Sequence, residues 1–187
     1  MRTIRTKVYR FSELSESAKQ KAIDWYRDGN EYHNSNEILS TIKIGLKQFG
    51  AILKNYSIYW DNINGCDFNI AIETTDEIEE LNGVRLWKYL HNNNILTYWN
   101  KYHKKTENLL NGDLPFTGVC FDSDFLDNIK DFVIKPANTT FNELLTDSVY
   151  NTIKAGCNDW EYQQSDEAIT DTIEANEYEF KADGTRF

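Results

Sequence analysis

The stretch NYSIYWDNINGCDFNIAIE, residues 55–73, predicts an antiparallel β-hairpin. Apolar side chains recur at every second position on both sides of a polar centre, which is the period of a strand with one buried face. The centre contains Asn64-Gly65, a dipeptide that favours a tight hairpin turn. The alternating residues are Tyr56, Ile58, Trp60, Phe68, Ile70 and Ile72.

Both ends of the chain also predict strands. Residues 3–10 alternate Ile4 and Val8 with polar neighbours, and residues 178–187 predict a hairpin that turns at Asp183-Gly184. The segments between them have apolar residues at spacings of three and four, which predicts helices. The predicted helices run from Ser12 or Ser15 to Gly29, over 36–49, 76–81 and 84–91, from Asp122 or Ser123 to Pro136, from Thr139 or Thr140 to Trp160, and over 166–176.

This order of elements predicts an α+β fold. We expect one antiparallel sheet, made of the N-terminal strand, the central hairpin and the C-terminal hairpin, covered by several helices. Residues 1–187 are expected to form a single domain that can carry an insertion at about 84–112. Residues 92–113 are mostly polar with a few aromatic residues among them, so the sequence does not decide between a helix and a loop-rich insertion there.

The charge balance is acidic, with 30 Asp and Glu residues against 20 Lys and Arg and a net charge of −10. Residues 1–54 contain ten basic and six acidic residues, so the acidity lies in the remainder. Binding to phosphates needs clustered Lys and Arg. We therefore expect no direct nucleic-acid binding and a basic host protein as the partner, which is itself a nucleic-acid-binding protein.

The sequence contains no GxGxxG, GxxxxGK[ST] or GxSxG motif, and its three histidines share no metal-ligand spacing. We expect no cofactor, no metal and no enzymatic activity. The first twenty residues hold no long apolar run, and no segment approaches the roughly 20 apolar residues of a membrane span. We expect a cytoplasmic protein with three reduced cysteines, Cys66, Cys120 and Cys157.

Residues 162–180, YQQSDEAITDTIEANEYEF, contain six acidic residues and no basic one. On a helix over 166–176, Glu167, Asp171 and Glu174 share one face. Two interpretations stay open: a solvated helix face, or an acidic stripe that docks in a basic groove. The candidate partner-binding residues are Asp166, Glu167, Asp171, Glu174 and Glu177.

A second acidic group consists of Asp122, Asp124, Asp127 and Asp131. Together with Asp67 and Glu73 it leaves a metal-dependent nuclease or hydrolase as an alternative, since converging carboxylates hold catalytic metal ions. The residues after Glu73 are threonines, so the lysine that such nucleases place there is missing.

Four segments resemble a family of small acidic proteins of phages and prophages, some of which are labelled antitoxin-like. The segments are KVYRFSELSESAKQKAIDWYRD, LPFTGVCFDSDFLDNIKDFVIKP, TTFNELL and YQQSDEAITDTIEANEYEFKADGTRF. The resemblance implies a phage accessory protein in a bacterial host cell and brings no catalytic residues. We therefore expect an inhibitor of a host defence protein, of anti-CRISPR or anti-restriction type. An antitoxin-like binder of a basic toxin is the nearest alternative.

Overall fold

The structure is a computed structural model that describes residues 6–29, 34–61, 65–74, 76–111 and 114–187, with side chains left out at 60, 61, 65–67, 76 and 77. The chain forms two compact units. Residues 1–33 and 159–187 make up the first, here called the terminal unit, and residues 34–158 make up the central unit. In the described part of the chain, no helix is both long and apolar enough to cross a membrane.

Two helices, α1 (Glu16–Gly29) and α7 (Asp166–Ala175), build the terminal unit. Each follows a serine cap: the Oγ atoms of Ser15 and Ser165 accept hydrogen bonds from the N–H groups three residues later, at 3.4 and 3.2 Å. Their apolar faces meet in one buried cluster. Its members are Phe11, Leu14, Ala18, Ala22, Ile23, Ile169, Ile173 and Phe180.

A short sheet joins the two ends of the chain within this unit. Strand β1 (Tyr9–Arg10) is antiparallel to β6 (Glu179–Phe180), and the 3₁₀ turn η1 (Phe11–Glu13) follows β1. The predicted turn at Asp183-Gly184 is confirmed. Gly184 is required there, because its φ is +82° and a Cβ atom would lie 2.2 Å from the Ala18 carbonyl oxygen.

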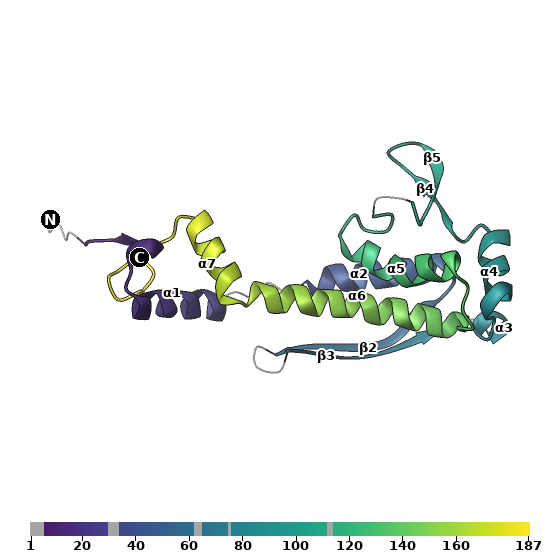
Figure 1. The fold of residues 1–187 in the computed structure, drawn as a ribbon, viewed down its shortest axis with the longest axis horizontal. Coiled ribbons are helices and arrows are strands. Elements are labelled where there is room, and N and C mark those ends of the chain that lie inside the picture. Colours follow the sequence, from purple (N-terminus) through teal and green to yellow (C-terminus); the bar gives the residue numbers. More distant parts are fainter. Residues whose placement is uncertain (1–5, 30–33, 62–64, 75, 112–113) are drawn as a thin grey trace. The chain divides into compact units, whose positions relative to one another are not determined.

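Three helices organise the central unit: α2 (Ser35–Gln48), α5 (Phe121–Ile134) and α6 (Phe141–Gln163), the last of which extends beyond residue 158 (Figure 1). Their spans match the sequence prediction closely. They share one core with α4 (Gly83–Asn92), which follows the short helix α3 (Asp76–Glu79). Fully buried core residues include Ile38, Ile42, Leu46, Leu86, Leu90, Phe125, Ile129, Leu145, Val149 and Ile153.

The central hairpin is confirmed as β2 (Ile52–Asp61) paired antiparallel with β3 (Gly65–Glu73). Ile58 pairs with Phe68, and both pack partly against the helical core. Tyr59, which has the opposite phase, is 67% exposed. The predicted turn residue Asn64 lies outside the described part of the chain.

The prediction of one shared sheet is wrong. In the described residues the strands form three separate two-stranded sheets, β1–β6, β2–β3 and β4–β5. Apolar alternation identified half-buried strands, but it did not show what covers them. The apolar residues of β2 and β3 pack against the helical core, and β1 and β6 pair with each other in the terminal unit.

Residues that the sequence left open form a second hairpin in the central unit. Strand β4 (Thr97–Asn100) pairs antiparallel with β5 (Lys105–Asn108). Leu96 and Leu109 flank the pair and are buried in the core, so the base of the hairpin is anchored. The predicted insertion at about 84–112 therefore contributes core residues to the central unit.

The cysteines differ from expectation. Cys120 is a free, exposed thiol, whereas Cys157 on α6 is disulfide-bonded, so the prediction of three free thiols is wrong. The side chain of Cys66 lies outside the described part of the structure. Disulfides are uncommon in a reducing cytosol, and this bond does not support the cytoplasmic location expected from the sequence.

The carboxylate of Asp122, in the first turn of α5, is fully buried and anchors the segment before the helix. Its Oδ2 accepts hydrogen bonds from the N–H groups of Phe116, Thr117 and Gly118 at 2.9, 2.8 and 3.1 Å. Its Oδ1 accepts from the hydroxyls of Thr117 and Thr41 at 2.7 and 2.9 Å. The prediction that Asp122 or Ser123 caps α5 is wrong, because Asp122 lies inside the helix and binds the preceding segment.

Replacing this buried acceptor is expected to destabilise the protein strongly. Asp122→Asn keeps the shape but presents an N–H₂ group to donors, and we expect a loss of about 3 kcal/mol or more in the free energy of unfolding. Asp127→Asn is the matched control on the same helix, where an exposed change stays within about 0.5 kcal/mol. Urea unfolding measures both, and equal stability of the two variants would contradict the anchoring role.

Candidate functional site

The predicted acidic stripe lies on the solvent face of α7. Glu167, Asp171 and Glu174 are exposed, while Ile169 and Ile173 on the opposite face are buried. Glu167 lies in the first turn, where the helix dipole favours a negative charge. Asp171 and Glu174 are beyond that turn, and like charges at this spacing repel by a few tenths of a kcal/mol, roughly. The helix gains no stability from them.

Asp166 differs from the other predicted residues because it has a basic partner. The Arg27 guanidinium of α1 donates from Nη2 to the Asp166 carboxylate. Arg27 also donates from Nε to the Gln164 carbonyl at 3.1 Å and from Nη1 to Asp24 at 3.0 Å. Asp166 therefore helps to hold α7 on α1, and a partner would compete with Arg27 for it.

Glu177 follows α7 in a left-handed conformation, with φ +49°. Its N–H donates to the Glu174 carbonyl at 3.0 Å, and the Tyr178 N–H donates to the Ile173 carbonyl at 3.2 Å. This pair of bonds is the Schellman motif, in which glycine is the usual residue at this position. A charged residue stands here where the backbone favours glycine.

Glu174 and Glu177 line the same hollow of about 220 Å³ in the terminal unit. The other lining residues are Arg10, Phe11, Ser12, Ile173 and Tyr178. The two carboxylates outnumber the one cation, Arg10, and together with the apolar and aromatic surface they suit a side chain with an apolar stem and a cationic head, such as lysine or arginine. The part of the chain that the structure describes contains no ion pair to Glu167, Asp171, Glu174 or Glu177.

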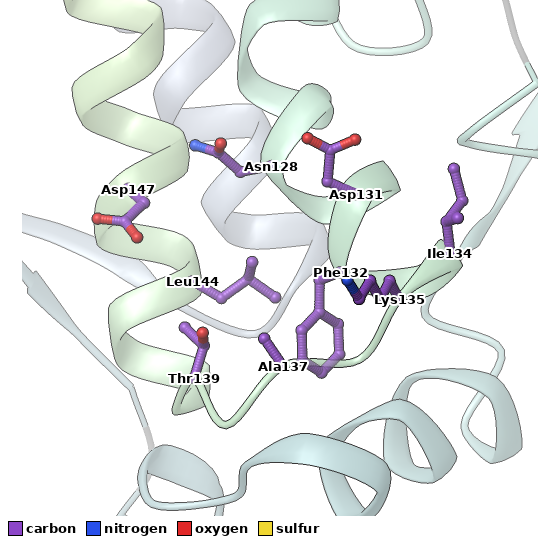
Figure 2. Close-up of a pocket in the computed structure, with 9 residues that line it drawn as sticks. All are labelled: Asn128, Asp131, Phe132, Ile134, Lys135, Ala137, Thr139, Leu144 and Asp147. Carbon is purple, nitrogen blue, oxygen red and sulfur yellow. The ribbon is translucent and has the colours of Figure 1, made fainter.

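A second acidic region lies between α5 and α6 in the central unit. A groove of about 440 Å³ places Asp131 of α5 and Asp147 of α6 beside Phe132 and Leu144, with Lys135 also in its lining (Figure 2). The lysine offsets part of the charge, so this groove is less acidic than the face of α7.

The other members of the second acidic group do not converge with Asp131. Asp122 is occupied by its hydrogen bonds. Asp124 has its pKa raised, first by burial and then by the neighbouring Asp127. Asp127 itself lies 3.4 Å from the Lys130 ammonium. In the described residues, no three His, Cys, Asp or Glu side chains are placed to hold a metal ion.

The β4–β5 hairpin carries a network around Glu107, whose side chain is 18% exposed. His103 Nδ1 lies 2.8 Å from Glu107 Oε1, and Asn100 donates to Oε2 at 2.8 Å. The Tyr98 hydroxyl and the Lys105 ammonium complete the set at 3.0 and 3.3 Å. These contacts, with that of His103 the largest, lower the pKa of Glu107 to about 2.

No family model, no curated protein and no solved structure matches the chain. Function is therefore inferred from geometry and charge. The sequence identified the acidic stripe but missed Arg27 and the hollow, because both join segments far apart in the chain; Arg27 and Asp166 are separated by 139 residues. For the hollow, the local sequence offered one indication: Glu177 stands directly after α7, at a position where glycine is common.

The strained position of Glu177 gives a prediction for stability. Glu177→Gly relieves a left-handed conformation that costs roughly 1–2 kcal/mol for an L-residue, against an entropic loss of about 0.5–1 kcal/mol for glycine. We expect the free energy of unfolding to stay equal or rise by up to about 1.5 kcal/mol. Urea unfolding of the variant beside Glu177→Ala measures this, and a glycine variant less stable than the alanine variant would show that the conformation is not left-handed.

The lowered pKa of Glu107 predicts acid sensitivity of the β4–β5 hairpin. In the unfolded chain Glu107 binds a proton near its ordinary pKa of 4.5, whereas in the folded hairpin it does so only near 2. Its contribution to the free energy of unfolding is therefore present above about pH 5 and is lost as the pH falls toward 2. In the folded protein the carboxylate titrates at its own pKa, so the amide shift of His103, followed by NMR below pH 5, should move with a midpoint near pH 2. Glu107→Gln should abolish this transition, and an unchanged transition in the variant would refute the assignment.

Proposed function

We propose that the protein is a non-enzymatic, phage-type binding protein that inhibits a host defence or nucleic-acid-handling protein by occupying its basic groove. The observation that carries this proposal is the exposed face of α7, where Glu167, Asp171 and Glu174 have no ion-pair partner among the described residues. Action in the cytoplasm of a bacterial host belongs to the same proposal.

The physics of association favours this use of the acidic face. A field of one sign raises the rate of encounter with a surface of the opposite sign, and the effect falls with ionic strength. Charges at the rim of an interface act mainly on this rate. Nucleic-acid-binding grooves present the clustered lysines and arginines that would respond to such a field.

The hollow beside the stripe supplies a short-range anchor. Glu174 and Glu177 can receive the head of one lysine or arginine, while Phe11 and Tyr178 contact its stem. Contacts of this kind, shielded from water at the centre of an interface, contribute most to affinity. The acidic face would then set the rate of association and the hollow the lifetime of the complex.

The experiment is affinity capture from lysate with three proteins: the wild type, Glu167→Lys with Asp171→Lys, and a control with Glu16→Lys and Asp28→Lys on α1. Both variants change the net charge equally at exposed positions, and each substitution should alter stability by no more than about 0.5 kcal/mol. Mass spectrometry of proteins eluted by added DNA identifies partners whose nucleic-acid site is occupied.

We expect one captured protein to bind the wild type and the α1 control equally fast. It should associate more slowly with the α7 variant, and that slower rate should fall less strongly with added salt. Equal association of the α7 variant and the wild type at low salt would mean that the stripe is only a solvated face. A partner that DNA cannot displace would exclude occupation of a nucleic-acid groove.

A further inference from the structure

The tip of the β4–β5 hairpin is basic and aromatic in an otherwise acidic protein. Three of the central unit's lysines, Lys101, Lys104 and Lys105, lie within five residues. Between and beside them, Trp99 is 61% exposed and Tyr102 is 94% exposed. Large aromatic side chains exposed to this degree, next to clustered positive charge, are unusual on a surface that serves only to stay solvated.

Hydrogen bonds within the hairpin fix the backbone that carries these side chains. The Asn100 side-chain oxygen accepts from the N–H groups of Tyr102 and His103 at 2.9 and 3.1 Å, which fixes the path of the tip. The Glu107 carboxylate is held among His103, Asn100 and Tyr98 beneath it. The tip is therefore ordered by its own hydrogen bonds.

The lysines differ in their availability. Lys105 lies 3.3 Å from Glu107 and is partly neutralised. Lys101 and Lys104 are exposed and form no ion pair in the described part of the chain. Lys104 also has φ +51°, a conformation that favours glycine or asparagine, so a charged side chain is again kept where the backbone prefers another residue.

We propose that the tip of the β4–β5 hairpin binds single-stranded nucleic acid, with Lys101 and Lys104 at backbone phosphates and Trp99 and Tyr102 stacked on unpaired bases. The combination of rings and lysines favours this ligand over an acidic polypeptide, which would use the charge but leave both rings without a flat partner. Duplex DNA hides its bases in the stack, so single strands are the better fit.

This inference goes beyond the proposed function and does not depend on it, because the acidic face lies in the terminal unit and the hairpin in the central unit. The expectation that the protein would not bind nucleic acid rested on net charge. Repulsion from distant acidic residues is screened beyond roughly 8 Å at physiological salt, so a local basic tip can act alone. The affinity is expected to be modest, since few phosphates are neutralised.

The test is fluorescence anisotropy of the full chain with a labelled oligothymidylate. For two or three phosphates, affinity should fall by roughly 7- to 18-fold between about 50 mM and about 200 mM salt. Trp99→Ala with Tyr102→Ala should weaken binding by about 5- to 150-fold for each stacked base. Trp99→Phe with Tyr102→Phe keeps both rings and should bind within a few-fold of wild type, roughly.

Matched controls separate the tip from general surface effects. The tip variant Lys101→Glu with Lys104→Glu should lose most of the salt dependence of binding. The control variant Lys88→Glu with Lys154→Glu changes exposed sites elsewhere in the central unit and should bind more tightly than the tip variant. Tyr59→Ala removes a comparably exposed ring from the other hairpin and should have no effect.

Several outcomes would overturn the proposal. Failure of the wild type to bind the oligothymidylate at low salt would refute binding at the tip. Equal losses in the tip and control lysine variants would indicate a nonspecific charge effect. Displacement by polyglutamate as readily as by unlabelled oligothymidylate would assign the tip to acidic polypeptides instead. Tighter binding to the paired duplex would exclude stacking on unpaired bases.

Discussion

The buried carboxylate of Asp122 is the interaction on which the central unit depends. It receives three backbone N–H groups from residues 116–118 and a hydroxyl from Thr41 of α2, so one side chain joins a loop and two helices. A buried charge is tolerated only when its hydrogen-bonding capacity is filled, and here five donors fill it. The start of α5 is thereby fixed against α2, and the apolar faces of both helices are aligned for packing.

Two exposed sites depart from local backbone preference in the same way. Glu177, after α7, and Lys104, at the tip of the β4–β5 hairpin, both adopt the left-handed conformation that favours glycine. Natural sequences tend to break such local rules where a side chain has a task besides stability. One site adds negative charge beside a hollow and the other adds positive charge beside exposed rings. The protein thus presents two surfaces of opposite sign, each on a separate unit.

Local patterns predicted most elements but not their assembly. The 3.6-residue periodicity of Ile38, Ile42 and Leu46 identified α2, and the alternation around Ile58 and Phe68 identified the central hairpin. The single-sheet prediction failed because strand periodicity carries no information about which layer covers the apolar face. The acidic stripe was readable from residues 162–180, whereas the pairing of Asp166 with Arg27 was not, since that pairing depends on how α1 packs on α7.

Carboxyl footprinting of the complex with the captured partner tests directly whether the acidic face of α7 and the hollow beside it form the interface. Carbodiimide labels exposed Asp and Glu side chains, and mass spectrometry reads each position in the free and bound protein. We expect Glu167, Asp171, Glu174 and Glu177 to be shielded in the complex, while Asp131 and Asp147 in the α5–α6 groove label at the same rate as in the free protein. Unchanged labelling of these four carboxylates, with protection of Asp131 and Asp147, would contradict binding through the acidic face of the terminal unit.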